Sequence, residues 1–475
     1  MLERQSIARN LGWLALGNVA VKPFWFVFLL LTARLLGSAG YGQFMFAISL
    51  VTVAAAVLEG GLDILTVREI STDPRKYERY LGHTVTFKLL SGLIGSAAVV
   101  AITVLLGMGR EVITLVFFAA FFSVSNTLLL HFRFIFRSFE VFKYEALSVI
   151  LEKTSVIALC GAVLLMHKSV VAYMIGYASA YCITCLVTLA VLLVKIGMPK
   201  MQLSLSYFWS EILKPALPFA IMNLFIIIYF RAGTIMLKAL TGQEELVGYY
   251  NAGYRLVESF MLFPTIIVAP IYPVISRIRD NPEEVRRVMS EAMRALLFVG
   301  VSIALPILIF RQKLTLLLFG EGYRNAVACV GILALTMIPI SIEYAAGTLV
   351  AALGRQGKSN WFVFATTVLN LVLNYFLIRE FSAYGASWTT VLTETFLVIC
   401  NLVLVRDYID WHRLLSLLLK FTLPPLLVGA LMLTPIGEAS FSIQIVIAGV
   451  VMLGGYFLLK LITVDDLKKL LHAVA

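Results

Sequence analysis

Basic side chains stand inside long apolar stretches of this chain. Lys22 lies within GNVAVKPFWFVFLLLTARLLG, Arg231 within NLFIIIYFRAGTIMLKAL, and Arg255 in the stretch that follows. A cation in a membrane helix costs about 2.5–3.5 kcal/mol on insertion scales, so it should face the protein interior or a water-filled cavity. Lysine ammonium and arginine guanidinium groups bind anionic oxygens, including those of phosphate groups. We therefore predict that Lys22, Arg231 and Arg255 bind a phosphate-bearing group.

A simpler interpretation is that acids of the same chain neutralise these cations. Glu258 lies one helical turn after Arg255, within reach of an ion pair. Two other deep cations, Lys88 and Lys153, are expected to pair internally or to extend toward an aqueous face. Lys22 and Arg231 lie several turns from either end of their apolar stretches, which favours the binding interpretation for these two cations.

Tyrosines and asparagines in the second half of the chain are candidates for contact with sugar. Tyr249, Tyr250 and Tyr254 cluster at the start of one apolar stretch, and Asn370 and Asn374 lie one helical turn apart in another. Tyrosine at such a depth is also typical of the membrane interface. Paired asparagines also form hydrogen bonds between membrane helices. Both interpretations stay open for each group.

Patterns for catalysis or metal binding are absent from the sequence. The five histidines do not lie at metal-ligand or triad spacing, and the C-x-x-C of Cys182 and Cys185 has no further ligands nearby. No G-x-x-x-x-G-K-[ST] motif for nucleotide binding occurs. We predict no enzymatic activity, no resident cofactor and no metal.

The composition is that of a protein embedded in lipid. Of the 475 residues, 60% are hydrophobic and 14% are charged, and the mean hydropathy is +0.93. Soluble proteins carry about 25% charged residues. The apolar runs are long enough to cross a hydrocarbon core of about 30 Å as helices. We predict an all-α polytopic membrane protein with membrane lipids as neighbours.

The basic residues between the apolar runs set the orientation. Most of the lysines and arginines in loops fall on the side of the N-terminus, which predicts that both termini face the cytoplasm across the cytoplasmic membrane. Much of the net charge of +11 is then a topology signal, and we expect no nucleic acid partner.

Breaks between the apolar runs give about fourteen predicted transmembrane helices. Residues 1–195 are assigned to an N-terminal bundle of six helices, and 196–214 to a polar cytoplasmic linker. Residues 215–405 hold six further helices. Residues 406–475 hold a final helix pair and a cytoplasmic tail.

The two predicted bundles carry an internal repeat. LLGSAGYGQFMFAISLV resembles LTGQEELVGYYNAGYRLV, with Gly37 matching Gly242 and Gly42 matching Gly248. Both copies join an odd-numbered helix to the next through an outer turn, so the repeat is parallel. Parallel repeats are typical of secondary transporters, whose site lies between the halves near the membrane midplane. The three candidate phosphate-binding cations are therefore expected to converge on one cavity.

The run TARLLGSAGYGQFMFAISLVTVAAAVLEGGLDILTVREIS, with FRSFEVFKYEA and AGYRLVESF further on, resembles a known family. It is similar to repeat-unit flippases of the Wzx type, in the multidrug/oligosaccharidyl-lipid/polysaccharide exporter superfamily. The resemblance implies two six-helix bundles in a V, two extra C-terminal helices and alternating access. It also implies a polyprenyl-diphosphate-linked oligosaccharide as substrate, whose diphosphate the cations would bind.

Uphill transport without a nucleotide-binding domain requires an ion gradient, for which a buried carboxylate is the usual binding group. Glu258, Glu343 and Glu394 are candidates for coupling to Na⁺ or H⁺, and transport without coupling stays open. Asp63 and Arg68, together with Glu69, are interpreted as an inner-side charge cluster that forms a gate.

We predict a flippase for cell-surface polysaccharide biosynthesis, with other polysaccharide-assembly proteins as further candidate partners. Three alternatives stay open. A drug or organic-cation antiporter of the same superfamily would place acids in the central cavity. A flippase for the peptidoglycan lipid precursor would use the same cations. A membrane-embedded glycan transferase or polymerase would need a catalytic acid or histidine facing water.

Overall fold

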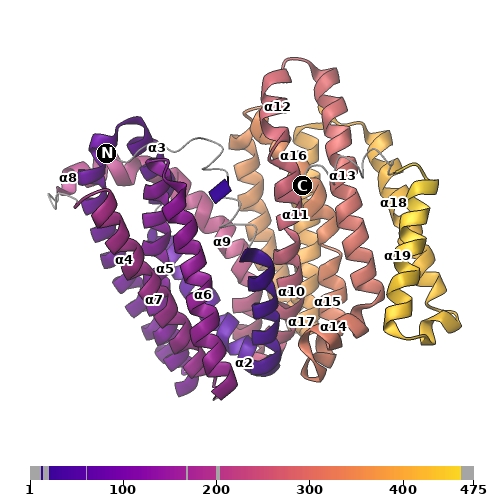
Figure 1. Cartoon of the computed structure of the whole chain (residues 1–475), viewed down its shortest axis with the longest axis horizontal. Helices are drawn as coiled ribbons and strands as arrows, with labels where there is room; N and C mark the ends of the chain where they lie inside the picture. Colours follow the sequence, from indigo (N-terminus) through magenta and orange to yellow (C-terminus); the bar gives the residue numbers. More distant parts are fainter. Residues whose placement is uncertain (1–11, 14–20, 60, 167–168, 199–203, 462–475) are drawn as a thin grey trace. The chain divides into compact units, whose positions relative to one another are not determined.

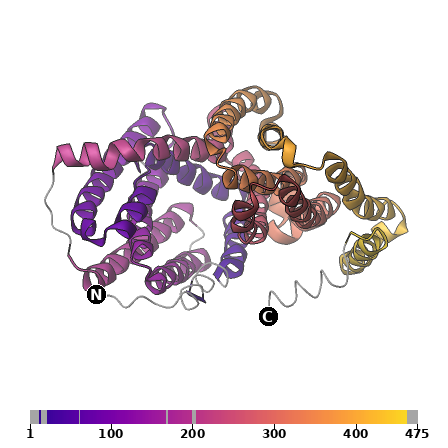
Figure 2. The same cartoon turned by 90° about the horizontal axis from the view of Figure 1, so that it is seen from above.

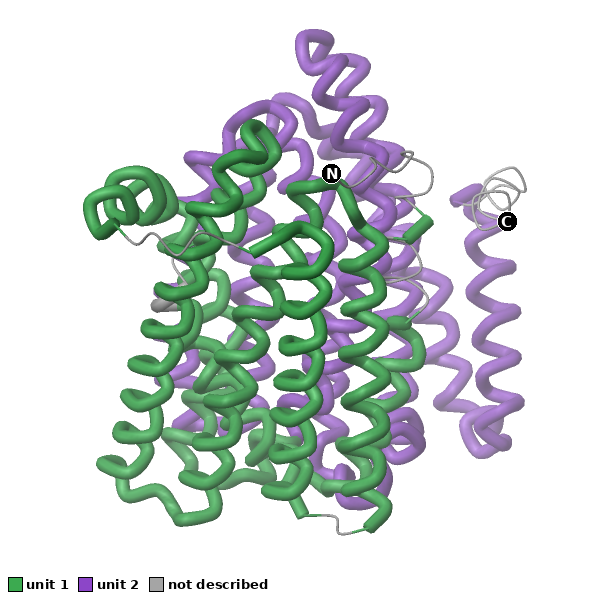
Figure 3. The backbone as a smooth tube through the Cα atoms, turned by 60° about the vertical axis from the view of Figure 1, so that its left-hand side comes forward, with its two compact units in different colours: residues 1–248 green, residues 249–475 purple. Residues whose placement is uncertain are grey.

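The regular structure is helical throughout the residues that the computed structural model describes, namely 12–13, 21–59, 61–166, 169–198 and 204–461 (Figure 1). The chain forms two compact units, residues 1–248 and 249–475, drawn in green and purple in Figure 3. The tail predicted at the end of the chain lies outside the described residues from position 462 onward.

Unit 1 is built from long apolar helices joined by short turns. α5 packs against α4 and α7, α6 packs against α7, and α2 contacts α4, α5 and α9. The helices of unit 1 are α2 (Val21–Glu59), α3 (Leu62–Thr72), α4 (Tyr77–Leu105), α5 (Arg110–Ser138), α6 (Phe142–Met166), α7 (Val170–Lys195), α8 (Leu205–Tyr207), α9 (Lys214–Thr241) and the first turn of α10 (Glu244–Phe260).

Residues of α12, α13, α16, α17, α18 and α19 form an apolar core in unit 2. α13 packs against α16 and α18, and α18 and α19 lie side by side at the yellow end of the chain in Figure 2. After α10 the helices are α11 (Leu262–Val268), α12 (Ile271–Ile278), α13 (Pro282–Ile309), α14 (Arg311–Phe319), α15 (Val327–Ala334), α16 (Met337–Ala352), α17 (Gln356–Leu404), α18 (Trp411–Leu431) and α19 (Phe441–Leu458).

Several helices begin at a residue whose side chain caps the helix. Ser169, Asn281 and Asp410 precede α7, α13 and α18, and each accepts a hydrogen bond from the backbone N–H three residues on, at 3.4, 3.3 and 2.9 Å. Pro282 follows Asn281 at the first helical position, where its missing N–H costs nothing. These helix starts are therefore encoded locally.

The prediction of an all-α polytopic membrane fold is confirmed, whereas the predicted number of helices is not. Eleven helices in the described ranges are long and apolar enough to cross a membrane, or up to twelve if the bent pair Glu244–Val268 and Ile271–Ile278 is one span. α2 and α17 contain 39 and 49 residues and are each broken by a non-helical residue, Gly37 and Ser382. A 49-residue helix is about 70 Å long, more than twice the hydrocarbon thickness. Fourteen spans stay a prediction that depends on dividing α2 and α17 at these breaks.

Matching glycines of the internal repeat have matching structural roles. Gly37 and Gly242 have φ of 72° and 69°, in the left-handed region that favours glycine. Gly42 and Gly248 lie where the backbones of α2 and α10 meet. A Cβ at Gly42 would stand 1.9 Å from the carbonyl oxygen of Glu244, and one at Gly248 would stand 2.0 Å from that of Ser38. Only glycine fits this crossing.

The division into units follows contacts, whereas the predicted bundles follow the repeat. α9 belongs to unit 1 because it packs against α2 and α3. The sequence-based boundaries place the same helix at the start of the second bundle, in residues 215–405. The bundle boundaries therefore stay predictions.

Candidate functional site

The three cations predicted to bind phosphate fall in different units. Lys22 lies exposed in the first turn of α2 as described, and it makes no salt bridge with any residue whose position the structure describes. Arg231 is half-buried in α9 of unit 1. Arg255 is in unit 2, where it forms the ion pair with Glu258 that their spacing predicted, at 2.6 Å. Their convergence on one cavity stays a prediction.

A charge cluster centred on Glu152 lies in the apolar part of unit 1. Arg133 of α5 contacts the Glu152 carboxylate at 2.7 Å, and the hydroxyl of Tyr181 of α7 donates to it at 2.8 Å. Lys153 donates to the same carboxylate oxygen as Tyr181. Arg133 also donates to the hydroxyl and the carbonyl of Ser148, at 3.0 and 2.9 Å. Two cations therefore share one carboxylate.

The packing of α6 explains why adjacent residues face different neighbours. Glu152 is buried between α5 and α7, which supply its partners. Lys153 is one position further, about 100° around the helix, and faces α2. Its ammonium lies 3.9 Å from the centre of the Trp25 ring, a cation–π distance. Lys153 is therefore paired inside the protein, one of the two interpretations that the sequence left open.

A second cluster involves Asp63, which the sequence placed in an inner gate with Arg68. Asp63 instead contacts buried Lys88 at 3.1 Å and Nδ1 of buried His131 at 2.6 Å. Thr84 lies 2.8 Å from the other ring nitrogen of His131. This cluster has one lysine for one carboxylate and ties α3 to α4 and α5.

Arg68 and Glu69 form a separate group at the end of α3. Arg68 contacts Glu69 at 3.0 Å, and Lys76 contacts it at 2.6 Å. The hydrogen bond from Lys76 holds the pKa of Glu69 below its usual range. Asp63 and Arg68 do not cluster because a separation of five residues turns the helix by about 140°. A role in gating stays a prediction for both.

The coupling candidates of unit 2 lie in α16 and α17. Glu343 accepts a hydrogen bond from the Asn401 amide at 2.7 Å, and its other oxygen is buried without a partner among the described residues. Glu394 is buried in α17. Neither contact identifies a coupling ion, and the roles of Glu258, Glu343 and Glu394 stay predictions.

The residues predicted to contact sugar are buried within unit 2. Asn370 donates to Thr393 at 3.2 Å, and Asn374 donates to Asn370 at 2.8 Å, so these amides link the two parts of α17. This is the alternative of hydrogen bonding between helices. Tyr250 stacks on Tyr254 with 5.6 Å between ring centres. Tyr249, Tyr250 and Tyr254 are all buried, and their contact with sugar stays a prediction.

The sequence reasoning missed several members of the unit 1 clusters. Arg133 was not among the candidates, although α5 continues to Ser138 and buries its side chain. Glu152 and Trp25 were not selected. One available signal was the four-residue spacing of Tyr173, Tyr177 and Tyr181, which places three tyrosines on the face of α7 that receives Glu152.

The family model described as "Polysaccharide biosynthesis protein" matches residues 7–279. A "Probable low-salt glycan biosynthesis flippase Agl15" of Haloferax volcanii is 26% identical over 152 residues, which cover 32% of either chain. A "Probable flippase AglR" of the same organism is 29% identical over 161 residues, 32% of this chain and 33% of the relative. The match thus spans about a third of the length of these relatives.

Two solved structures have a similar fold. A lipid II flippase MurJ in an inward closed conformation superposes with a TM-score of 0.76 at 12% identity, covering 93% of this chain and 98% of that one. An inward-facing multidrug resistance MATE family transporter superposes with a TM-score of 0.64 at 15% identity, covering 86% and 98%. At these identities the likeness concerns the fold.

Proposed function

Because this chain belongs to the family of polysaccharide biosynthesis proteins, we propose that it is a flippase for a polyprenyl-diphosphate-linked oligosaccharide. It moves this lipid from the inner to the outer leaflet of the cytoplasmic membrane by alternating access. The observation that carries the proposal is the excess of cations over carboxylates in the apolar helices of unit 1. Lys22 has no carboxylate partner among the described residues, and Arg133 and Lys153 share Glu152.

The names of the relatives support this substrate class, since both Haloferax volcanii proteins are designated flippases and one is assigned to glycan biosynthesis. The chain is a multi-pass membrane protein. In our proposal both termini face the cytoplasm, the protein is not an enzyme, and other polysaccharide-assembly proteins receive the exported lipid.

In this mechanism Lys22, Arg231 and Arg255 bind the diphosphate. A diphosphate in lipid must be neutralised, because isolated charge there is costly. Arg255 exchanges Glu258 for the substrate and returns to it on release, so that neither charge is left alone. Arginine is suited to this exchange, since its planar fork accepts carboxylate and phosphate oxygens in the same geometry.

The return of the empty carrier is coupled to Na⁺ or H⁺ in this proposal, with no resident cofactor. Glu343 and Glu394 are the coupling carboxylates. Support comes from the Glu343 oxygen that is buried without a partner among the described residues, a position in which a carboxylate takes up a proton or an ion at low cost. Asp63 and Arg68 act at the inner ends of the helices as a gate.

The same oxygen favours one second candidate, an organic-cation antiporter. Such a protein would bind its substrate at carboxylates, and Glu343 is a carboxylate with spare binding capacity in unit 2. The two candidate functions differ in the charge of the transported substrate, which is an anionic lipid for the flippase and a cation for the antiporter.

Transport in proteoliposomes tests the proposal. The wild type is compared with Lys22→Ala, Arg231→Ala and Arg255→Ala, using a fluorescent polyprenyl-diphosphate oligosaccharide. Lys358→Ala removes an exposed lysine in the first turn of α17 and serves as the matched control. We expect the wild type and the control to transport the lipid at similar rates. The three other variants should fold but transport it more slowly. A wild type that ignores the lipid and exchanges an organic cation would establish the antiporter instead.

A further inference from the structure

Lys153 lies too deep to reach an aqueous face. It is near the middle of α6, which extends from Phe142 to Met166, so about 16 Å of helix separates it from the first residue and about 20 Å from the last. Its side chain keeps 20% of its surface exposed, whereas that of Glu152 beside it keeps 4%. A partly exposed lysine near the middle of a membrane helix is a functional candidate.

The contacts of the Glu152 cluster make Lys153 its movable cation. Arg133 is fixed by the carboxylate and by two hydrogen bonds to Ser148. The carboxylate is also held by the hydroxyl of Tyr181. Within the described part of the chain, Lys153 has only the shared carboxylate oxygen and the Trp25 ring as partners, although an ammonium has three protons to donate. If Lys153 turns away, Glu152 remains neutralised by Arg133.

The Asp63 cluster provides a contrast within the same unit. Lys88 is 1% exposed, and its carboxylate partner Asp63 contacts no second lysine or arginine among the described residues. Removing Lys88 from that cluster would leave the carboxylate with His131 alone. The Glu152 cluster can therefore release Lys153 and keep an arginine on its carboxylate, whereas the Asp63 cluster would keep only His131.

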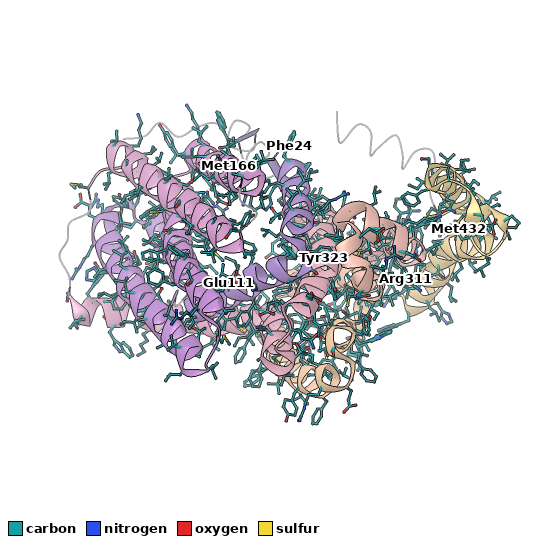
Figure 4. All side chains as sticks on the ribbon, turned by 90° about the horizontal axis from the view of Figure 1, so that it is seen from below. Phe24, Glu111, Met166, Arg311, Tyr323 and Met432 are labelled. Carbon is teal, nitrogen blue, oxygen red and sulfur yellow. The ribbon has the colours of Figure 1, made fainter. Side chains whose placement is uncertain are left out.

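α2 places a second cation beside the same tryptophan. Lys22 precedes Trp25 by three residues, so the two side chains lie on one side of the helix. Phe24, between them in sequence, points away from the unit and is 73% exposed (Figure 4). The Trp25 ring therefore has an ammonium on α2 one turn away and another, from α6, over its face.

We propose that Lys22, Trp25 and Lys153 form one subsite, in which the two ammonium groups bind the diphosphate of the substrate and the indole supports its first sugar. This inference rests on the proposed function. A diphosphate that links a lipid to a sugar carries two negative charges, and the two ammonium groups not needed to balance Glu152 match them. When Lys153 turns from the ring to the diphosphate, it frees the ring face for the apolar C–H face of the sugar.

Binding is measured on the full chain in lipid nanodiscs, and transport in proteoliposomes. The probe is a polyprenyl diphosphate bearing one N-acetylglucosamine, and the comparison ligand is the corresponding monophosphate. Lys153→Met removes the movable cation, and Trp25→Phe isolates the fluorescence of that indole from the other tryptophans. Lys143→Met is the matched control, since Lys143 lies on the same helix 5.9 Å from the ring centre of Trp13.

We expect Lys153→Met to weaken binding of the diphosphate about 10- to 100-fold, as for the loss of a charge-assisted hydrogen bond. The preference for diphosphate over monophosphate should fall with it. Ligand should change the fluorescence of the wild type and of Lys143→Met, and this change should be lost in Trp25→Phe.

A folded Lys153→Met that binds and transports the diphosphate as the wild type does would overturn the subsite and leave the proposed function standing. A ligand-induced fluorescence change that persists in Trp25→Phe would also overturn it. A wild type that neither binds nor transports the diphosphate would reject the proposed function, and the subsite with it.

Discussion

Replacing Glu152 with glutamine is the most direct perturbation of the unit 1 charge cluster. The change keeps the shape of the side chain and removes its charge. Arg133 would keep its two hydrogen bonds to Ser148, and Lys153 would keep the Trp25 ring. Both would lose the carboxylate that neutralises them. The NH₂ group of the glutamine would also direct its N–H groups at Arg133 or Lys153, which are themselves hydrogen-bond donors.

The structure sets the expected size of the effect. The side chains of Arg133 and Glu152 are 9% and 4% exposed, so their contact is a buried pair. Removing one member of a buried pair costs about 3–5 kcal/mol in the free energy of unfolding. For a unit of this size 1 kcal/mol corresponds to about 2–4 °C, so the melting temperature should fall by roughly 6–20 °C. Lys153→Met should cost only about 1 kcal/mol, because Arg133 still neutralises Glu152.

Buried cysteines give a convenient assay in detergent. Cys160 on α6 and Cys185 on α7 are buried in unit 1, so a thiol-reactive dye reports their exposure on heating. Cys182 is exposed and Cys400 is half-buried, so replacing both by serine would lower the background signal. Equal shifts for Glu152→Gln and Lys153→Met, or a shift below about 2 °C for Glu152→Gln, would refute the assignment of the carboxylate as the shared counter-charge.

Two further predictions concern the packing and the pH dependence of unit 1. Gly42→Ala should destabilise the protein by about 1–3 kcal/mol, because its Cβ would meet the Glu244 carbonyl, whereas Gly454→Ala has open space and should be neutral in the same melting assay. The lowered pKa of Glu69, caused by Lys76, stabilises the fold above the usual carboxyl pKa of 4.5. This contribution, under about 1 kcal/mol, should disappear as the pH falls through the lowered pKa, and Glu69→Gln should melt without that step.

The sequence predicted the features that depend on local pattern. Apolar run length indicated membrane helices, and the three-residue spacing of Arg255 and Glu258 indicated their ion pair. Contacts between helices that are far apart in the sequence have no such local pattern. Arg133 and Glu152 meet only because α5 packs on α6, and residues from two helices share no local spacing. The sequence grouped Asp63 with Arg68 and Glu69 for the same reason. The residues that Asp63 contacts, Lys88 and His131, come from other helices.

The crossing of α2 and α10 at Gly42 and Gly248 has a consequence for how the chain can evolve. Most crowded contacts tolerate a larger side chain at one position if the opposite one shrinks. Glycine has no side chain to lose, and the opposing atoms here are backbone atoms, which no substitution removes. Neither of the two glycines can therefore be substituted independently at this crossing. We expect descendants of the chain to keep both glycines or to replace the crossing altogether.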